Sequence, residues 1–344
     1  MERVIVFCFG KSLNFSPGCY FLIFISKSFP MSIQMDEHNM LQRRDFLKKS
    51  LFASLGVLAA SKYGLANTRL LSDKPNSKIH GVQIGVITYS YRSMPGDIHQ
   101  ILKYVVDSGI NAIELMGDAV EDFAGRPKDR KKVAEWRATV GMEKFKEVRE
   151  LFNKAGVTIY AFKPDALDRH NSDAEIDYAL NATKALGSKV ATVELPEDAA
   201  QSARLGKFGE KHNIYIGYHA HTQATDTAWD TALGQSAFNT MNLDCGHYIA
   251  SGNGNTPESL LALIKNRHNR ITSLHIKDRK TKDDGGQNLP WGQGDTPIKE
   301  ILSLIRTNKY KFPATIELEY DIPSGSDAVQ EVKKCLDYAR KVLS

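Results

Sequence analysis

Eight short runs with strand character recur from residue 82 to the end of the chain, and longer segments of helical periodicity lie between them. The strand-like runs span 82–89, 111–116, 157–162, 189–195, 214–221, 241–244, 271–277 and 314–320. The helical segments lie near 97–107, 142–154, 173–186, 199–212, 256–266, 297–307 and 326–343. The fifth crossover is poorly defined. Such alternation predicts a parallel sheet whose strands are joined by crossover helices.

The number of strand-like runs favours one of two parallel architectures. Eight strands in about 260 residues suit a closed barrel, whose usual length is about 250 residues. No glycine-rich phosphate fingerprint follows the first run, which weighs against the alternative, an open doubly wound sheet. We therefore predict an α/β fold, a single (β/α)8 TIM barrel, over residues 79–344.

Polar and apolar residues alternate within the late runs. In the last run, Ile316 and Leu318 share one face, while Thr315, Glu317 and Glu319 share the other. The runs 189–195, 214–221, 241–244 and 271–277 show the same split. In a barrel the aliphatic face meets the helices and the other face points inward. The polar residues then lie near the carboxyl ends of the strands, where enzymes of this fold have their active sites.

Three carboxylates and one imidazole on the inward faces form a candidate metal site: Glu194, Asp244, His275 and Glu317. Buried carboxylates are costly unless they are paired or bind a metal. This donor set suits one divalent ion, Mn²⁺, Co²⁺ or Mg²⁺. Such an ion would polarise a sugar carbonyl and stabilise an enediolate after proton removal, and we assign catalysis to Glu194, Glu317 and His219.

Five further residues are candidate substrate contacts because sugar hydroxyls and carbonyls need polar partners: Glu114, His221, His247, Lys277 and Arg279. Each also has a structural interpretation. Lys277 would form an ion pair with a barrel carboxylate, Glu114 would form a buried salt bridge, and His247 would cap the turn after Asp244.

Six segments, in this order, carry a resemblance to a known family: Ile113–Gly117, Tyr218–His221, Leu243–His247, Leu274–Asp278, Gly292–Thr296 and Ile316–Tyr320. Over residues 82–344 the chain resembles the xylose isomerase-like barrels, the sugar phosphate isomerases and epimerases that also include inosose dehydratase. The resemblance implies one divalent metal held by Glu, Asp, His and Glu.

The last three of these ligands match Asp244, His275 and Glu317, and the first stays open. The fifth run, where many epimerases carry the ligand Glu, reads His-Ala-His here. Either Glu194 on the fourth run or His219 on the fifth run completes the set, and we favour Glu194. Without a fifth-run Glu, a symmetric two-base epimerisation is less well supported, so a single-base isomerisation and an elimination both stay open.

The resulting functional prediction is a metal-dependent isomerase or epimerase of a free or keto-sugar. The alternative is a lyase that dehydrates a keto-sugar or cleaves a keto-glycoside after the same proton abstraction. A non-catalytic sugar-binding protein and an abasic-site endonuclease have less support. The net charge of +5 lies partly in the leader and in the run 126–132, so we expect a carbohydrate partner and no nucleic acid. Homo-oligomerisation is left open.

Residues 1–78 have the composition of an export leader and a linker. Arg43 and Arg44 precede an apolar stretch over 51–60 and a small-residue ending, which predicts a twin-arginine signal over about 41–66. The apolar stretch is shorter than the roughly 20 residues of a membrane-spanning helix. We therefore predict a periplasmic protein with no membrane association after the signal is cleaved.

The position of the arginine pair bears on where translation starts. Signals rarely begin more than 40 residues into a chain, so we expect translation to start at Met31, Met35 or Met40.

Overall fold

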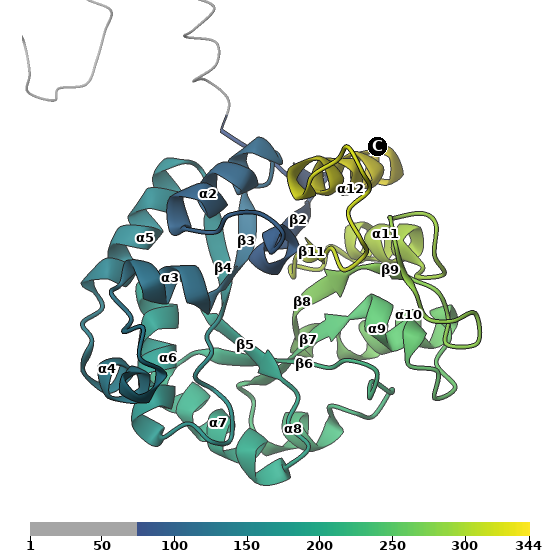
Figure 1. The fold of residues 1–344 in the computed structure, drawn as a ribbon. Coiled ribbons are helices and arrows are strands. Elements are labelled where there is room, and N and C mark those ends of the chain that lie inside the picture. The colour runs from purple at the N-terminus through teal and green to yellow at the C-terminus, as the bar shows by residue number, and fades with distance from the viewer. Residues whose placement is uncertain (1–73) are drawn as a thin grey trace, which may run out of the picture. The chain divides into compact units, whose positions relative to one another are not determined.

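The computed structural model describes residues 74–344, which form a closed barrel of parallel strands surrounded by helices (Figure 1). Each of the eight barrel strands pairs with its neighbours in chain order, and the last strand pairs with the first. The predicted (β/α)8 barrel is confirmed, and the open doubly wound sheet is excluded because the first barrel strand pairs with the last and closes the sheet.

The barrel strands are β2 (Val82–Ile87), β3 (Ala112–Met116), β4 (Thr158–Lys163), β5 (Val190–Glu194), β6 (Tyr215–His219), β7 (Asn239–Asp244), β8 (Ile271–Ile276) and β11 (Ala314–Ile316). A short strand, β1 (Lys78–Ile79), pairs antiparallel with β2. A small hairpin, β9 (Asp278–Arg279) and β10 (Asn288–Leu289), follows β8.

The main crossover helices are α2 (Ile98–Asp107), α5 (Glu143–Lys154), α6 (Asp173–Ala185), α7 (Ala199–His212), α10 (Pro257–Arg267), α11 (Ile298–Asn308) and α12 (Ala328–Leu343). Their bounds lie within two residues of the predicted ones. Capping boxes begin α2, α6 and α10, because Asp97, Ser172 and Thr256 each accept from the backbone three residues on. The fifth crossover contains only the short helix α8 (Asp230–Gln235), as its weak pattern indicated.

Three short helices were not predicted from the sequence. They are α3 (Gly117–Phe123), α4 (Val133–Thr139) and α9 (Cys245–Ala250). Each spans about two turns, and segments this short give little periodicity to detect. The predicted strands over 82–89, 214–221 and 314–320 were each too long at the carboxyl end. After Ile316, for example, the backbone N–H of Leu318 donates to the Ser90 hydroxyl instead of a neighbouring strand.

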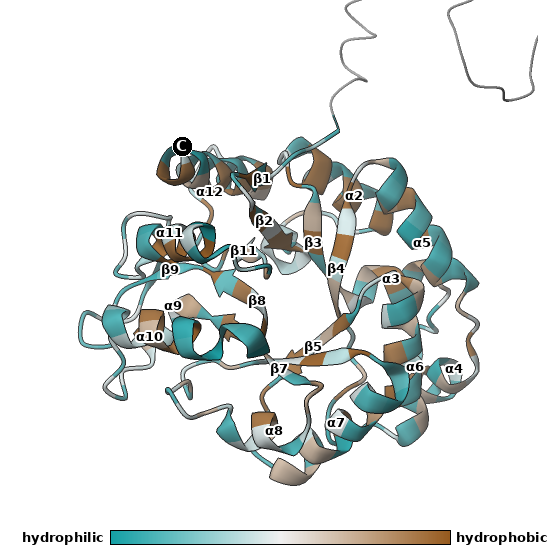
Figure 2. Ribbon diagram, turned by 180° about the vertical axis from the view of Figure 1, so that it is seen from behind, coloured by the Kyte–Doolittle hydropathy of each residue, from teal (hydrophilic) through white to brown (hydrophobic). Residues whose placement is uncertain are grey.

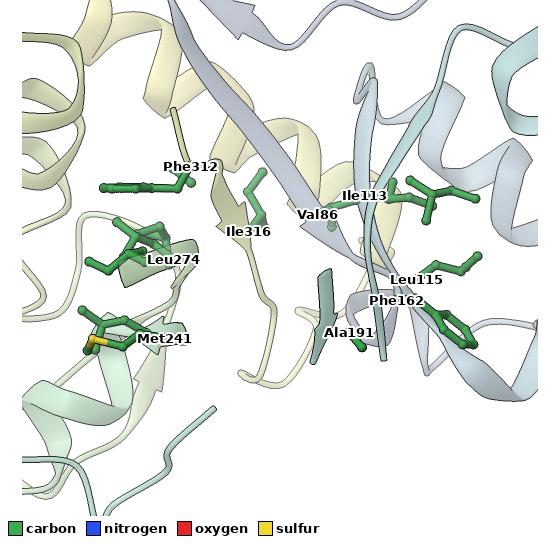
Figure 3. Packing of buried hydrophobic residues seen from close by; sticks show 14 of the residues in the cluster. Val86, Ile113, Leu115, Phe162, Ala191, Met241, Leu274, Phe312 and Ile316 are labelled. Carbon is green, nitrogen blue, oxygen red and sulfur yellow. The ribbon is translucent and has the colours of Figure 1, made fainter. Parts of the chain in front are cut away.

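The apolar core lies between the strands and the ring of helices. Figure 3 shows Ile113 and Phe162 on one side of the barrel and Met241 and Leu274 on the other, pointing away from the barrel centre. These four side chains are at most 1% exposed. The helices turn hydrophilic residues outward, as Figure 2 shows for α5. The aliphatic faces predicted from the alternation therefore meet the helices.

Polar side chains fill the inside of the barrel. Thr192 donates to Glu114 across the barrel at 2.6 Å, and Asn242 donates to the other oxygen of the same carboxylate at 3.0 Å. Gly217 gives this network room, because a Cβ there would lie 3.2 Å from Thr192 and 3.1 Å from the Thr272 hydroxyl, closer than most Cβ contacts. The predicted inward face is confirmed, and it holds a hydrogen-bonded network instead of aliphatic layers.

No helix within residues 74–344 is both long and apolar enough to cross a membrane. The predicted twin-arginine signal, the leader and the expected start codons lie outside the described residues.

Candidate metal centre and active site

Four side chains gather at the carboxyl ends of four consecutive barrel strands. His219 ends β6, Asp244 ends β7, His275 lies one residue before the end of β8, and Glu317 directly follows β11. All four are buried, and one nitrogen or oxygen from each lies within 4.8 Å of the others. The parallel register places Asp244 beside His275, because these two residues pair across β7 and β8.

His219 presents a free ring nitrogen to this group. Its Nδ1 lies 3.0 Å from Asn242 Oδ1, and the Asn242 amide nitrogen donates to Glu114, so Asn242 must accept from His219. The Nε2 lone pair then faces Asp244 Oδ2 at 4.0 Å. Burial first, and then the charge of His275, holds the pKa of His219 well below its usual range. The imidazole is therefore neutral, as a metal ligand must be.

His275 lies between two carboxylates. Its Nε2 is 2.8 Å from Glu114 Oε2, and its Nδ1 is 2.7 Å from Glu317 Oε2. Burial acts to lower the pKa of His275, but Glu317 and Glu114 together raise it to about 10. With a metal on Nδ1 the ring would lose one proton and keep its Nε2–H bond to Glu114, the arrangement that orients many metal-binding histidines.

Glu114 is fully buried beneath His275 and accepts from three side chains. A substrate cannot reach this carboxylate. Glu114 therefore forms the buried ion pair that was one of its two predicted roles, and it does not face the space open to a substrate.

Asp244 carries an unsatisfied oxygen. Its Oδ1 accepts from the backbone N–H of His247 at 2.6 Å and so caps α9. Its Oδ2 is buried and makes no hydrogen bond within residues 74–344. The Lys277 ammonium lies 3.0 Å from this oxygen without hydrogen-bond alignment, and it also lies 2.9 Å from Glu317 and 2.9 Å from Glu319.

The centre has more acidic than basic groups. When all are ionised, two cations face four carboxylates: Lys277 and His275 against Glu114, Asp244, Glu317 and Glu319. Burial raises the pKa of Asp244, and Glu317 raises it further against the opposing effect of Lys277. A divalent cation would balance this excess and engage the unsatisfied Asp244 oxygen, so the donor set fits a metal.

Glu194 lies outside the four-residue group. Its two oxygens lie 2.7 Å from Lys163 Nζ and 3.2 Å from His221 Nε2, and about half of its side chain is exposed. Burial acts to raise the pKa of Glu194, but His221 and Lys163 hold it well below its usual range. The expectation that Glu194 completes the metal set does not match this arrangement, in which His219 takes that place.

His247 and Arg279 form the wall of the site beside α9. Arg279 Nη1 lies 2.6 Å from His247 Nδ1, and Lys277 Nζ lies 3.0 Å from Nε2. Burial, then Lys277, lowers the pKa of His247 to about 3. His219, His221 and His247 also come within 4.8 Å of one another. Because both ring nitrogens of His247 face cations, this second group is poorly suited to hold another one.

Two charged residues of the site received no role from the sequence. Lys163 ends β4, one residue beyond the predicted run, and pairs with Glu194. Glu319 shares the inward face with Glu317 and pairs with Lys277. The sequence contained one signal that could have identified them, their position at the carboxyl ends of predicted strands. Lys277, predicted to contact substrate, is only 2% exposed and takes the ion-pair interpretation instead.

The fold and the site together define a class of protein: a TIM barrel with its titratable residues gathered at the carboxyl ends of the strands, where enzymes of this fold place their chemistry. The chain belongs to the xylose isomerase-like TIM barrel family, whose model matches residues 102–341. No curated protein matches the sequence.

Solved structures confirm the fold. A probable 3-DHS dehydratase from Bacillus anthracis is 14% identical, with 74% of this chain and 98% of that chain covered and a TM-score of 0.57. A sugar phosphate isomerase/epimerase from Parabacteroides distasonis is 19% identical, with coverage of 77% and 96% and a TM-score of 0.53. The 3-keto-D-glucoside 4-epimerase from E. coli is 13% identical, with coverage of 76% and 99% and a TM-score of 0.55. At such identities the likeness is one of fold.

Proposed function

We propose that this protein is a divalent-metal-dependent isomerase or epimerase of a free or keto-sugar. One observation carries the proposal: His219, Asp244, His275 and Glu317 converge with a buried, unsatisfied carboxylate oxygen at the mouth of the barrel. Two imidazoles and two carboxylates suit Mn²⁺ or Co²⁺ better than Mg²⁺, which prefers oxygen ligands. A bound divalent ion would polarise a substrate carbonyl and acidify the neighbouring C–H.

Glu194 is the proton carrier in this proposal. Its low pKa keeps it ionised at neutral pH, and its exposed oxygens are within reach of a substrate at the mouth. Lys163 and His221 hold the carboxylate from two sides, which fixes its direction. Glu317 is less suited to proton transfer, because its side chain is buried and belongs to the four-residue group that would hold the metal.

A lyase is the second candidate, supported by the position of His221. Its ring is half exposed, lies 3.2 Å from a Glu194 oxygen and stacks on His247 with ring centroids 4.6 Å apart. An imidazole held there would protonate a leaving oxygen after the same C–H abstraction. The dehydratase among the structural neighbours is compatible with such an outcome, as are the two epimerases.

The roles of Glu194 and His219 are separated by two variants. We expect Glu194→Gln to retain one equivalent of Mn²⁺ by elemental analysis but to lose deuterium incorporation from D₂O into keto-sugars. His219→Gln should lose the metal. Metal loss in the Glu194 variant together with full metal in the His219 variant would reverse the two assignments. Absence of deuterium exchange by the wild type across a keto-sugar panel would refute the enzyme proposal.

We also propose export to the periplasm, which rests on the arginine pair and apolar stretch of the leader alone. N-terminal sequencing of the native protein tests it. We expect a mature start soon after residue 66, and a mature start before residue 40 would contradict it.

A further inference from the structure

A cavity of about 560 Å³ adjoins the metal centre, between the loop that follows β4 and the start of α7. Its inner edge is formed by Lys163 at the end of β4, Glu194 at the end of β5, and Thr192 within β5. Glu194 also lies 3.2 Å from His221, so this residue is shared by the cavity and the candidate active site. Its volume lies within the range of about 300–1,000 Å³ for small-molecule sites.

The floor of the cavity is apolar and firmly built. Leu195 and Pro196 line it with partly exposed side chains, and the buried Leu167 and Leu205 also belong to its wall. The buried amide of Gln201, on α7, donates to the backbone oxygen of Leu167 at 2.9 Å, which ties the β4 loop to the helix. A floor of this kind packs against the C–H face of a ring without rearrangement.

The rim of the cavity is acidic. Five carboxylates face two cations: Asp165, Asp168, Glu194, Glu197 and Asp198 against Lys163 and Arg169. Glu194 and Lys163 neutralise each other, and Asp168 and Asp198 already accept from backbone N–H groups. Asp165 and Glu197 are exposed, and neither carboxylate pairs with another residue in the range 74–344.

This combination selects the chemistry of an occupant. A phosphate or carboxylate group would meet a surplus of like charge, which opposes its binding. Hydroxyl groups would instead donate to the two unpaired carboxylates, which act only as acceptors when ionised. An apolar floor beneath such acceptors fits an uncharged sugar ring.

We propose that this cavity binds a second, uncharged sugar unit of the substrate, next to the unit that reacts at the metal centre. The substrate is then a neutral disaccharide or larger glycoside, and not a sugar phosphate or a single sugar. The position of the reacting unit rests on the proposed function.

The proposal is tested by calorimetric titration of the protein with glucose and with five disaccharides in which two glucose units are joined by different linkages. The probes are cellobiose, maltose, laminaribiose, sophorose and gentiobiose. We expect at least one disaccharide to bind ten times more tightly than glucose. Asp165→Ala and Glu197→Ala should each weaken that disaccharide about tenfold, the worth of one hydrogen bond to a charged acceptor, and should leave glucose unchanged.

Glu258→Ala is the matched control, because Glu258 is an exposed acid on α10 that does not line the cavity. Its affinities should equal those of the wild type. If no disaccharide binds more tightly than glucose, or if the cavity variants weaken both sugars equally, the proposal is wrong.

Running each titration with Mn²⁺ and again with EDTA separates this proposal from the metal-dependent function. If only the metal-dependent function is wrong, the protein should prefer the disaccharide equally with Mn²⁺ and with EDTA. Failure of the cavity proposal alone would leave metal binding and deuterium exchange intact and remove the preference.

Discussion

Replacing Lys277 with Met tests the electrostatics of the centre most directly. The ammonium is buried and lies within 3.0 Å of oxygens from Asp244, Glu317 and Glu319. Burial acts to lower the pKa of Lys277, but these three carboxylates raise it overall, so the side chain is charged at neutral pH. Methionine has a similar length and no charge, so the variant removes the cation and leaves the space filled.

The expected cost in metal-free protein follows from this environment. Removing one partner of a buried ion pair leaves an uncompensated charge and costs about 3–5 kcal/mol. For a domain of this size the corresponding fall in Tm is about 6–20 °C. The carboxylates are relieved when a divalent ion binds them, so saturating Mn²⁺ should restore most of the lost stability. We also expect Mn²⁺ to bind at least ten times more tightly, because the competing cation is gone.

The measurements are thermal unfolding in EDTA and in excess Mn²⁺, together with calorimetric titration of Mn²⁺. Lys299→Met is the control, because Lys299 is exposed on α11 and forms no ion pair within residues 74–344. If Lys277→Met unfolds at the wild-type temperature in EDTA, or if it binds Mn²⁺ more weakly than the wild type, the proposed competition between ammonium and metal is refuted.

Three further predictions concern pH, a turn and a helix cap. The folded-state pKa of His275 is raised from 6.5 to about 10, so its stabilisation of the metal-free fold is complete below pH about 6.5 and is lost as the pH rises through 10. Denaturation in EDTA at pH 6, 8 and 10 should show a fall in the free energy of unfolding that His275→Asn lacks. Parallel pH profiles of the two proteins would contradict this prediction. Gly294→Ala should cost about 1–3 kcal/mol, because a Cβ there would clash with Asp278 Oδ1, and the turn holds this carboxylate in place by three backbone N–H groups that donate to Oδ2. An unchanged midpoint in urea would count against this contact. Ser172→Ala should cost about 1 kcal/mol by removing the cap of α6, with Ser344→Ala at the chain end as a neutral control in the same urea titration.

The sequence alone predicted the barrel well, because the signals that specify it are local. Side chains alternate every two residues along a strand and repeat every 3.6 residues along a helix. These patterns of apolar residues can be recognised in the sequence without knowing which distant residues are in contact. The inward and outward faces of the late strands followed from the same alternation, as Ile316 and Glu317 illustrate. The polar residues near the carboxyl ends of successive strands also indicated that the active site lies at that end of the barrel.

The partners of each polar group depended on the tertiary structure. Glu194 and His219 end neighbouring strands, so their spacing in the sequence did not show which of them joins the group of Asp244, His275 and Glu317. Lys163, from a third strand, draws Glu194 to one side, while Asn242 fixes the ring of His219 toward Asp244. Such contacts join residues dozens of positions apart, and their distances are set by strand register and barrel curvature.

The sequence by itself therefore determined the class of fold, the inward faces and the candidate chemical groups, since each depends on periodicity and residue type within one element. Only the tertiary structure decided which groups meet. It placed Glu114 under His275, surrounded Lys277 with carboxylates, and opened a cavity beside Glu194 between a loop and a helix. The ionisation of the side chains and their preference for a metal depend on these contacts, because electrostatic interactions are set by distance and burial. The shape of the ligand that fits depends on the same arrangement.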